Sequence, residues 1–99
     1  MPTFICFLNW TDQGAKNAKD SGKRSQAARN MAEKLGGKLV SAYVTTGQYD
    51  VVATLEMPTG EAMVKFATAI SATGNVRTTT VRAYTPDEFG KLAAEAPTP

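Results

Sequence analysis

The sequence predicts a single α+β domain with the element order β-α-β-β-α-β, the ferredoxin-like arrangement, followed by a C-terminal helix. Segments rich in β-branched and aromatic residues alternate with segments whose apolar residues recur at helical spacing. Gly, Pro and Asn residues separate these segments. A chain of 99 residues, 42% of them apolar, suits one such domain, which we assign to residues 1–96 with a flexible tail at 97–99.

The N-terminal part of the chain predicts one strand and two helices. Residues 3–10 are rich in β-forming side chains and should form the first strand. Thr11 is expected to cap a short helix over residues 12–20. Ser21 is expected to cap a second helix over residues 22–35, which two consecutive glycines then end.

A β-hairpin is predicted in the middle of the chain. Its strands should span residues 38–46 and 49–57, because both segments are rich in β-branched and aromatic residues. Gly47 and Gln48 lie between them and match a two-residue type II′ turn. Pro58 ends the second strand, since proline has no amide to donate to a neighbouring strand.

The C-terminal part predicts a helix, a strand and a last helix. Thr59 should cap the first of these helices, whose apolar residues recur at helical spacing and which ends at Gly74. The fourth strand should span residues 76–84. Thr85 and Glu88 have the spacing of a capping box, with a proline at the first position of the last helix. Four antiparallel strands with the two main helices on one face follow from this order.

Histidine is absent and cysteine occurs once. The chain therefore holds no Ser-His-Asp or Cys-His catalytic set, no His-ligated metal site and no internal disulfide. We expect no metal and no cofactor. The lone Cys6 should be a small buried apolar residue, and an unpaired cysteine agrees with a cytoplasmic location.

The net charge of +2 is unevenly distributed along the chain. Residues 13–40 carry a net charge of +5, yet residues 11–42 contain no aromatic side chain. Nucleic-acid-binding surfaces usually combine basic and aromatic residues, so a solvated helix face is the favoured interpretation and no nucleic-acid partner is expected. The longest apolar runs are far shorter than the roughly 20 residues of a membrane span, so no membrane partner is expected either.

The first two strands are apolar on both sides, although the helices cover only one face of the sheet. The uncovered face would expose several hundred Å² of apolar surface, which is unusual for a monomer. We therefore predict a homodimer or higher homo-oligomer that forms through this open face. The alternative is that the C-terminal helix, which also has an apolar side, folds across the face.

Four segments resemble the GYD domain family, which is named for a Gly-x-Tyr-Asp motif. They are Leu8–Gly14, Ala27–Gly37, Gly47–Asp50 and Gly74–Thr78. The resemblance implies a small bacterial or archaeal stand-alone domain of the dimeric α/β-barrel type, and it implies no particular reaction. The Gly-x-Tyr-Asp turn is also similar to one in the effector-binding domains of leucine-responsive regulators.

Arg24 is the charged residue whose position most needs an explanation. It lies on the apolar stripe of its helix, together with Met31. A guanidinium there has to reach the end of the layer or pair with an anion. Asp12, Asp20 and Asp50 are the candidate partners within the chain, and the anionic group of a ligand is the alternative.

The turn motif provides the other candidate site residues. Gly47 should supply a positive φ, and the side chains of Tyr49 and Asp50 should point to opposite faces of the sheet. Asp50 is expected to accept hydrogen bonds from neighbouring backbone amides or, alternatively, to bind a ligand or act as a base. Trp10 offers a flat wall with one N–H donor, which is typical of core or interface packing as well as of a ligand site.

These residues lead to two hypotheses about function. The first is a module for small-molecule binding or interaction, with a pocket between sheet and helices lined by Trp10, Arg24 and Tyr49, with Asp50 nearby. The second is a cofactor-free enzyme, such as a monooxygenase or isomerase, that acts on a small aromatic or carboxylate substrate. Asp50 is the candidate catalytic residue in that case, and the missing histidine removes the most usual proton carrier.

Overall fold

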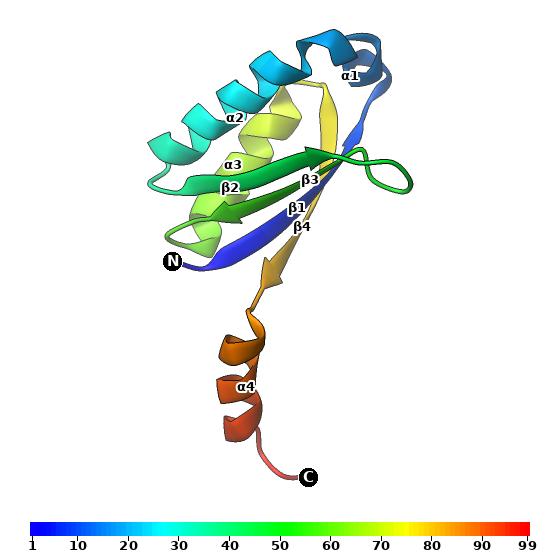
Figure 1. Ribbon diagram of the computed structural model, residues 1–99. Helices are drawn as coiled ribbons and strands as arrows, with labels where there is room; N and C mark the ends of the chain where they lie inside the picture. Colours follow the sequence, from blue (N-terminus) through cyan, green and yellow to red (C-terminus); the bar gives the residue numbers. More distant parts are fainter.

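The computed structural model describes residues 1–99 and contains the predicted elements in the predicted order. The elements are β1 (Thr3–Trp10), α1 (Asp12–Lys16), the 3-10 turn η1 (Ala18–Asp20), α2 (Ser21–Lys34), β2 (Lys38–Val44), β3 (Val51–Glu56), α3 (Gly60–Ala72), β4 (Val76–Ala83) and α4 (Pro86–Glu95). The strands form one antiparallel sheet in the order β2-β3-β1-β4, and α2 and α3 cover one of its faces (Figure 1). The ferredoxin-like arrangement is confirmed.

The core lies between the sheet and the two covering helices. Cys6 of β1 and Leu55 of β3 face α2 and α3 and are fully buried, as is Met57 just beyond β3. Phe66 of α3 and Ala32 of α2 complete this layer. Fully burying a large apolar side chain contributes roughly 1.5–3 kcal/mol, so this layer is the main source of stability.

Three of the four predicted helix caps are present. Thr11 and Thr59 each accept a hydrogen bond from the backbone amide three residues further on. Thr85 and Glu88 form the complete capping box. The prediction for Ser21 is wrong: Ser21 is the first residue of α2, and the preceding Asp20 makes no capping hydrogen bond through its side chain.

The predicted helix over residues 12–20 is in fact two short pieces. α1 ends at Lys16, and Asn17 leaves the helical region with φ −105° and ψ 29°. A 3-10 turn over residues 18–20 then leads directly into α2. The backbone therefore changes direction at Asn17, which brings α1 over the end of β1 and lets α2 run back along the sheet (Figure 1).

The predicted two-residue turn between β2 and β3 is also wrong. Val44 pairs with Val51, so the connection is the six-residue loop 45–50. The amide of the first loop residue donates to the carbonyl oxygen of the last, at 2.8 Å. Gly47 has the predicted positive φ, 104°, but Gln48 belongs to the wider loop. The turn signature in the sequence identified the conformation of the glycine and not the length of the loop.

The open face of the sheet is apolar, as predicted. Phe7, Val52 and Tyr43 are neighbours across three strands, and Ile5 and Val81 form the next row. Tyr43 is 68% exposed and Val81 is 43% exposed. This surface lies on the side of the sheet opposite α2 and α3, and none of the helices covers it.

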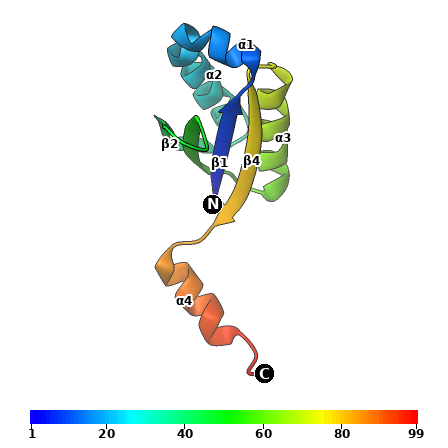
Figure 2. The same cartoon turned by 90° about the vertical axis from the view of Figure 1, so that its right-hand side faces the viewer.

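The alternative in which α4 folds across this open face is wrong. α4 leaves the end of β4 and projects below the sheet, away from α2 and α3 (Figures 1 and 2). Residues 84–99 are all exposed. The radius of gyration is 15.1 Å, compared with about 13 Å for a compact domain of this length. None of the helices has the length and apolar character needed to cross a membrane.

α1 packs closely against the turn that precedes β4. The Thr11 amide donates to the carbonyl oxygen of Asn75 at 3.0 Å, and the Thr11 hydroxyl donates to that of Gly74 at 2.6 Å. Gly14 is buried beside this turn. A Cβ atom on Gly14 would overlap the Asn75 carbonyl oxygen, so only glycine allows the two segments to approach this closely.

Replacing Gly14 with alanine should therefore destabilise the protein. We expect Gly14→Ala to lower the free energy of unfolding by about 1–3 kcal/mol, because the backbone has to move apart to admit the methyl group. Gly22→Ala is the matched control, since a Cβ atom at Gly22 meets nothing within 4 Å. It should be neutral or slightly stabilising within its helix. Urea denaturation measures both, and equal midpoints for the two variants would contradict this account.

Candidate functional site

The end of β1 is the point at which the loop 45–50 is attached to the sheet. The Trp10 amide donates to Oδ2 of Asp50 at 2.8 Å, and the Asp50 amide donates to the carbonyl oxygen of Leu8 at 3.0 Å. Nδ2 of Asn9 donates to the carbonyl oxygen of Gln48 at 2.7 Å. These three bonds hold the loop against β1 and fix the position of the Trp10 backbone.

Each residue named in the Gly-x-Tyr-Asp motif has a structural role in this loop. Gly47 adopts the positive φ that the loop requires. The Tyr49 ring packs on the Phe7 ring, with centroids 4.6 Å apart and planes inclined by 36°. Because Phe7 belongs to the open face, Tyr49 lies on that face as well. Asp50 accepts from the Trp10 amide, which is the backbone role predicted for it.

A half-open pocket of about 210 Å³ lies on the other side of the sheet, between α2, α3 and the strands. Fifteen of its 20 lining residues are apolar, so it is a mainly hydrophobic cavity. Trp10, Met31 and Ile70 contribute to its walls, as does Phe66 of α3. Arg24 is its one charged lining residue.

The structure brings only part of the predicted site together. Trp10 and Arg24 both line the pocket. The expectation that Tyr49 lines it is wrong, because the ring of this residue packs on Phe7 on the opposite face. Asp50 does not line the pocket either. Its carboxylate accepts from the backbone amide of Trp10, and Trp10 is the residue that lines the pocket.

Arg24 has a different partner from those considered. Its Nη1 and Nη2 atoms both donate to the carbonyl oxygen of Gly14, each at 3.3 Å, rather than to Asp12, Asp20 or Asp50. Both bonds are longer than the usual 2.7–3.2 Å or so for an N–H donor to oxygen. They occupy only part of the roughly five N–H donors of a guanidinium, so the half-buried group retains donors for an anion.

Several polar or polarisable residues that line the pocket were not predicted to do so, among them Cys6, Thr73 and Asn75. Cys6 is fully buried, and burial raises the pKa of its thiol despite a hydrogen bond from Thr80. The thiol is therefore protonated at neutral pH and acts as an apolar wall. Thr73 and Asn75 line the pocket from the turn before β4. The Gly74–Thr78 segment of the sequence had marked this turn, but nothing in it indicated a pocket.

No group of three or more His, Cys, Asp or Glu side chains is arranged to hold a metal ion. The chemical groups that the pocket offers are one guanidinium, one indole, hydroxyl groups and one amide, set among apolar walls. Such a lining can bind and orient an apolar molecule that carries a negative charge.

The GYD domain model matches residues 4–93. A Thermus thermophilus protein named glutamine synthetase and cystathionine beta-lyase binding protein is 29% identical over 84 residues, which are 84% of this chain and 88% of that protein. A crystal structure of a protein from Thermus thermophilus is 25% identical with a TM-score of 0.56, covering 86% of this chain and 95% of that one. The leucine response regulatory protein of Mycobacterium tuberculosis shares the fold, at 17% identity and a TM-score of 0.56 over 85% of this chain and 51% of that one.

Removing the Asp50 carboxylate should destabilise the end of β1. We expect Asp50→Ala to lower the free energy of unfolding by about 1–2 kcal/mol, because the half-buried Trp10 amide loses its acceptor. Asp50→Asn should cost less than about 1 kcal/mol, since its amide oxygen can still accept. Urea denaturation of the two variants tests this role, and wild-type stability of Asp50→Ala would contradict it.

Proposed function

The chain belongs to the GYD domain family, and we propose that it is a small-molecule-binding module whose ligand occupies the pocket between α2 and the sheet. The observation that carries this proposal is a cavity of about 210 Å³ in which one guanidinium is set among mainly apolar walls. Ligand sites are typically apolar concavities in which a few polar groups fix the orientation of the ligand.

The lining favours a ligand with an apolar body and one anionic group. Arg24 keeps N–H donors in addition to those that reach the Gly14 carbonyl oxygen. A carboxylate can accept two parallel hydrogen bonds from a guanidinium, which are among the strongest that side chains form. The Trp10 indole and the aliphatic walls suit an aromatic or aliphatic body. Small carboxylates are therefore the ligand class that fits.

Binding is supported better than catalysis. A general base has to lie within hydrogen-bond reach of the proton that it removes. Asp50, the candidate base, accepts from the Trp10 amide and does not line the pocket. The lining contains no carboxylate, so a monooxygenase-like or isomerase-like reaction has no carboxylate base at this place.

Self-association through the open face is the second part of this proposal. Phe7, Val52 and Ile5 of the open face do not line the pocket, so a second copy can cover them without blocking the ligand site. The Thermus thermophilus relative is named for binding two enzymes. That name supports a role in binding other molecules for a domain of this kind.

A thermal-shift screen with short aliphatic and aromatic carboxylates, each paired with its uncharged amide, tests the ligand site. A carboxylate present at about ten times its Kd should stabilise the folded protein by about 1.4 kcal/mol. For a domain of this size that is a rise in Tm of about 6–10 °C. The matching amide should give a much smaller shift, because it carries no charge for Arg24.

Arg24→Ala should abolish the shift that the carboxylate produces. Arg29→Ala is the matched control, because Arg29 lies on the same helix, donates to the Leu39 carbonyl oxygen and does not line the pocket. It should keep the shift. The proposal fails if no carboxylate shifts the wild-type protein, or if Arg24→Ala responds to an active carboxylate as the wild type does.

A further inference from the structure

α4 is an amphipathic helix whose apolar side is covered by nothing in its own chain. Phe89, Leu92 and Ala93 recur at i, i+3 and i+4 and therefore share one side of the helix. Phe89 is 63% exposed and Leu92 is 50% exposed. A short isolated helix is marginal in water, so this helix gains stability if its apolar side packs against another surface.

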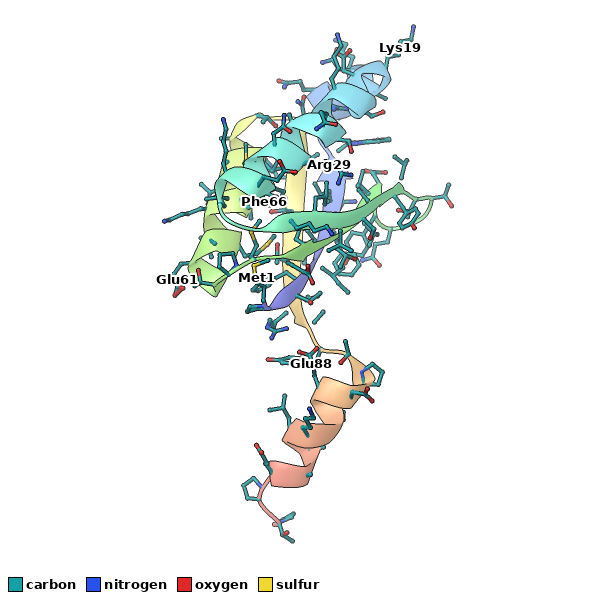
Figure 3. The ribbon with its side chains drawn as sticks, turned by 60° about the vertical axis from the view of Figure 1, so that its left-hand side comes forward. Met1, Lys19, Arg29, Glu61, Phe66 and Glu88 are labelled. Atoms are coloured by element: carbon teal, nitrogen blue, oxygen red, sulfur yellow. The ribbon has the colours of Figure 1, made fainter.

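The start of α4 is a short, capped junction that follows β4 directly. The Thr85 amide donates to Oε1 of Glu88 at 2.8 Å, and the Glu88 amide donates to the Thr85 hydroxyl oxygen at 3.1 Å. Only Tyr84 and Thr85 separate the helix from β4, and Pro86 restricts the backbone at its first position. Figure 3 shows Glu88 at this junction, below the sheet.

Charge favours contact between α4 and the body of another copy over contact between two copies of α4. α4 carries one lysine and three carboxylates, Asp87, Glu88 and Glu95, which is a net charge of −2. The rest of the chain carries a net charge of +4, but +5 of this lies in residues 13–40, mainly in α1 and α2 on the covered side of the sheet, and the remaining residues sum to −1. Two α4 helices, each at −2, therefore repel each other more than α4 and the sheet of a second copy do.

The open face alone is smaller than a standard stable interface, so a contact by α4 would supply area that the dimer needs. A face of four strands, each about seven residues long, covers about 450 Å², whereas a standard stable interface buries about 800 Å² on each partner. A helix of ten residues is about 15 Å long and about 10 Å wide, so it presents about 150 Å². In a two-fold pair each copy also buries its own helix, which adds about 150 Å² per copy to the area of the sheet face.

We propose that α4 is an arm that packs Phe89 and Leu92 on the margin of the open sheet face of a second copy of this chain. Two twisted sheets that meet face to face diverge at their corners, which leaves a margin for a helix. The two copies exchange arms symmetrically, and each arm adds to the contact between the sheets. This inference rests on the proposed self-association and is independent of the ligand in the pocket.

Light scattering and sedimentation velocity of the full chain over about 1–100 μM test the arm. We expect the wild type to dimerise and F89Q/L92Q to raise the dimer dissociation constant by at least about tenfold, since two large apolar side chains lose their contact. Val64→Gln is the matched control. Val64 is 65% exposed, about as much as Phe89, but it lies on α3, on the helix side of the sheet. It should stay within about twofold of the wild type.

A variant of the sheet separates the arm from the self-association on which it rests. Val81→Gln changes the open face itself and should also weaken the dimer. If Val81→Gln weakens the dimer while F89Q/L92Q leaves it as strong as the wild type, the proposed contact of α4 is overturned and the proposed self-association through the sheet stands. If the wild type is monomeric throughout, both are overturned. Far-UV circular dichroism checks that every variant keeps its helix content, and α4 is exposed enough for its variants to leave the core unchanged.

Discussion

The hydrogen bond between the Trp10 amide and the Asp50 carboxylate is the contact on which the rest of this end of the molecule depends. It holds the loop 45–50 against the end of β1, although 40 residues separate its two partners. On one side of the sheet this fixes the indole in the wall of the pocket. On the other side it carries Tyr49 over Phe7. One contact of the Gly-x-Tyr-Asp motif therefore organises both faces.

The sheet separates two kinds of surface. Its helix-covered face holds the core and, toward the end of β1, the half-open apolar pocket with Arg24. Its other face is apolar and uncovered, and α4 projects from the end of β4 with a second uncovered apolar side. Because buried apolar area is the main source of stability in a chain this short, both surfaces support a larger native assembly. A ligand and a second copy can be accommodated on opposite faces without competing.

The candidate site was predictable where it depends on periodicity and not where it depends on the path of a loop. Arg24 lies at helical spacing from Met31, so its position beside the sheet followed from the sequence, as did the strand position of Trp10. Tyr49 was assigned to the pocket on the assumption of a two-residue turn. The loop is longer because Asp50 is bound to β1, and this places the Tyr49 ring on the open face.

The order of elements, the three threonine caps and the positive φ of Gly47 could be predicted from the amino-acid sequence, because each depends on neighbouring residues or on a repeating pattern. The length of the β2–β3 loop, the pairing of Arg24 with the Gly14 carbonyl oxygen and the direction of α4 became known only from the folded chain. These features depend on contacts between segments far apart in the chain, or on the absence of such contacts. An amphipathic helix indicates in its sequence that it needs a partner, but only the folded chain reveals that the partner is not its own sheet.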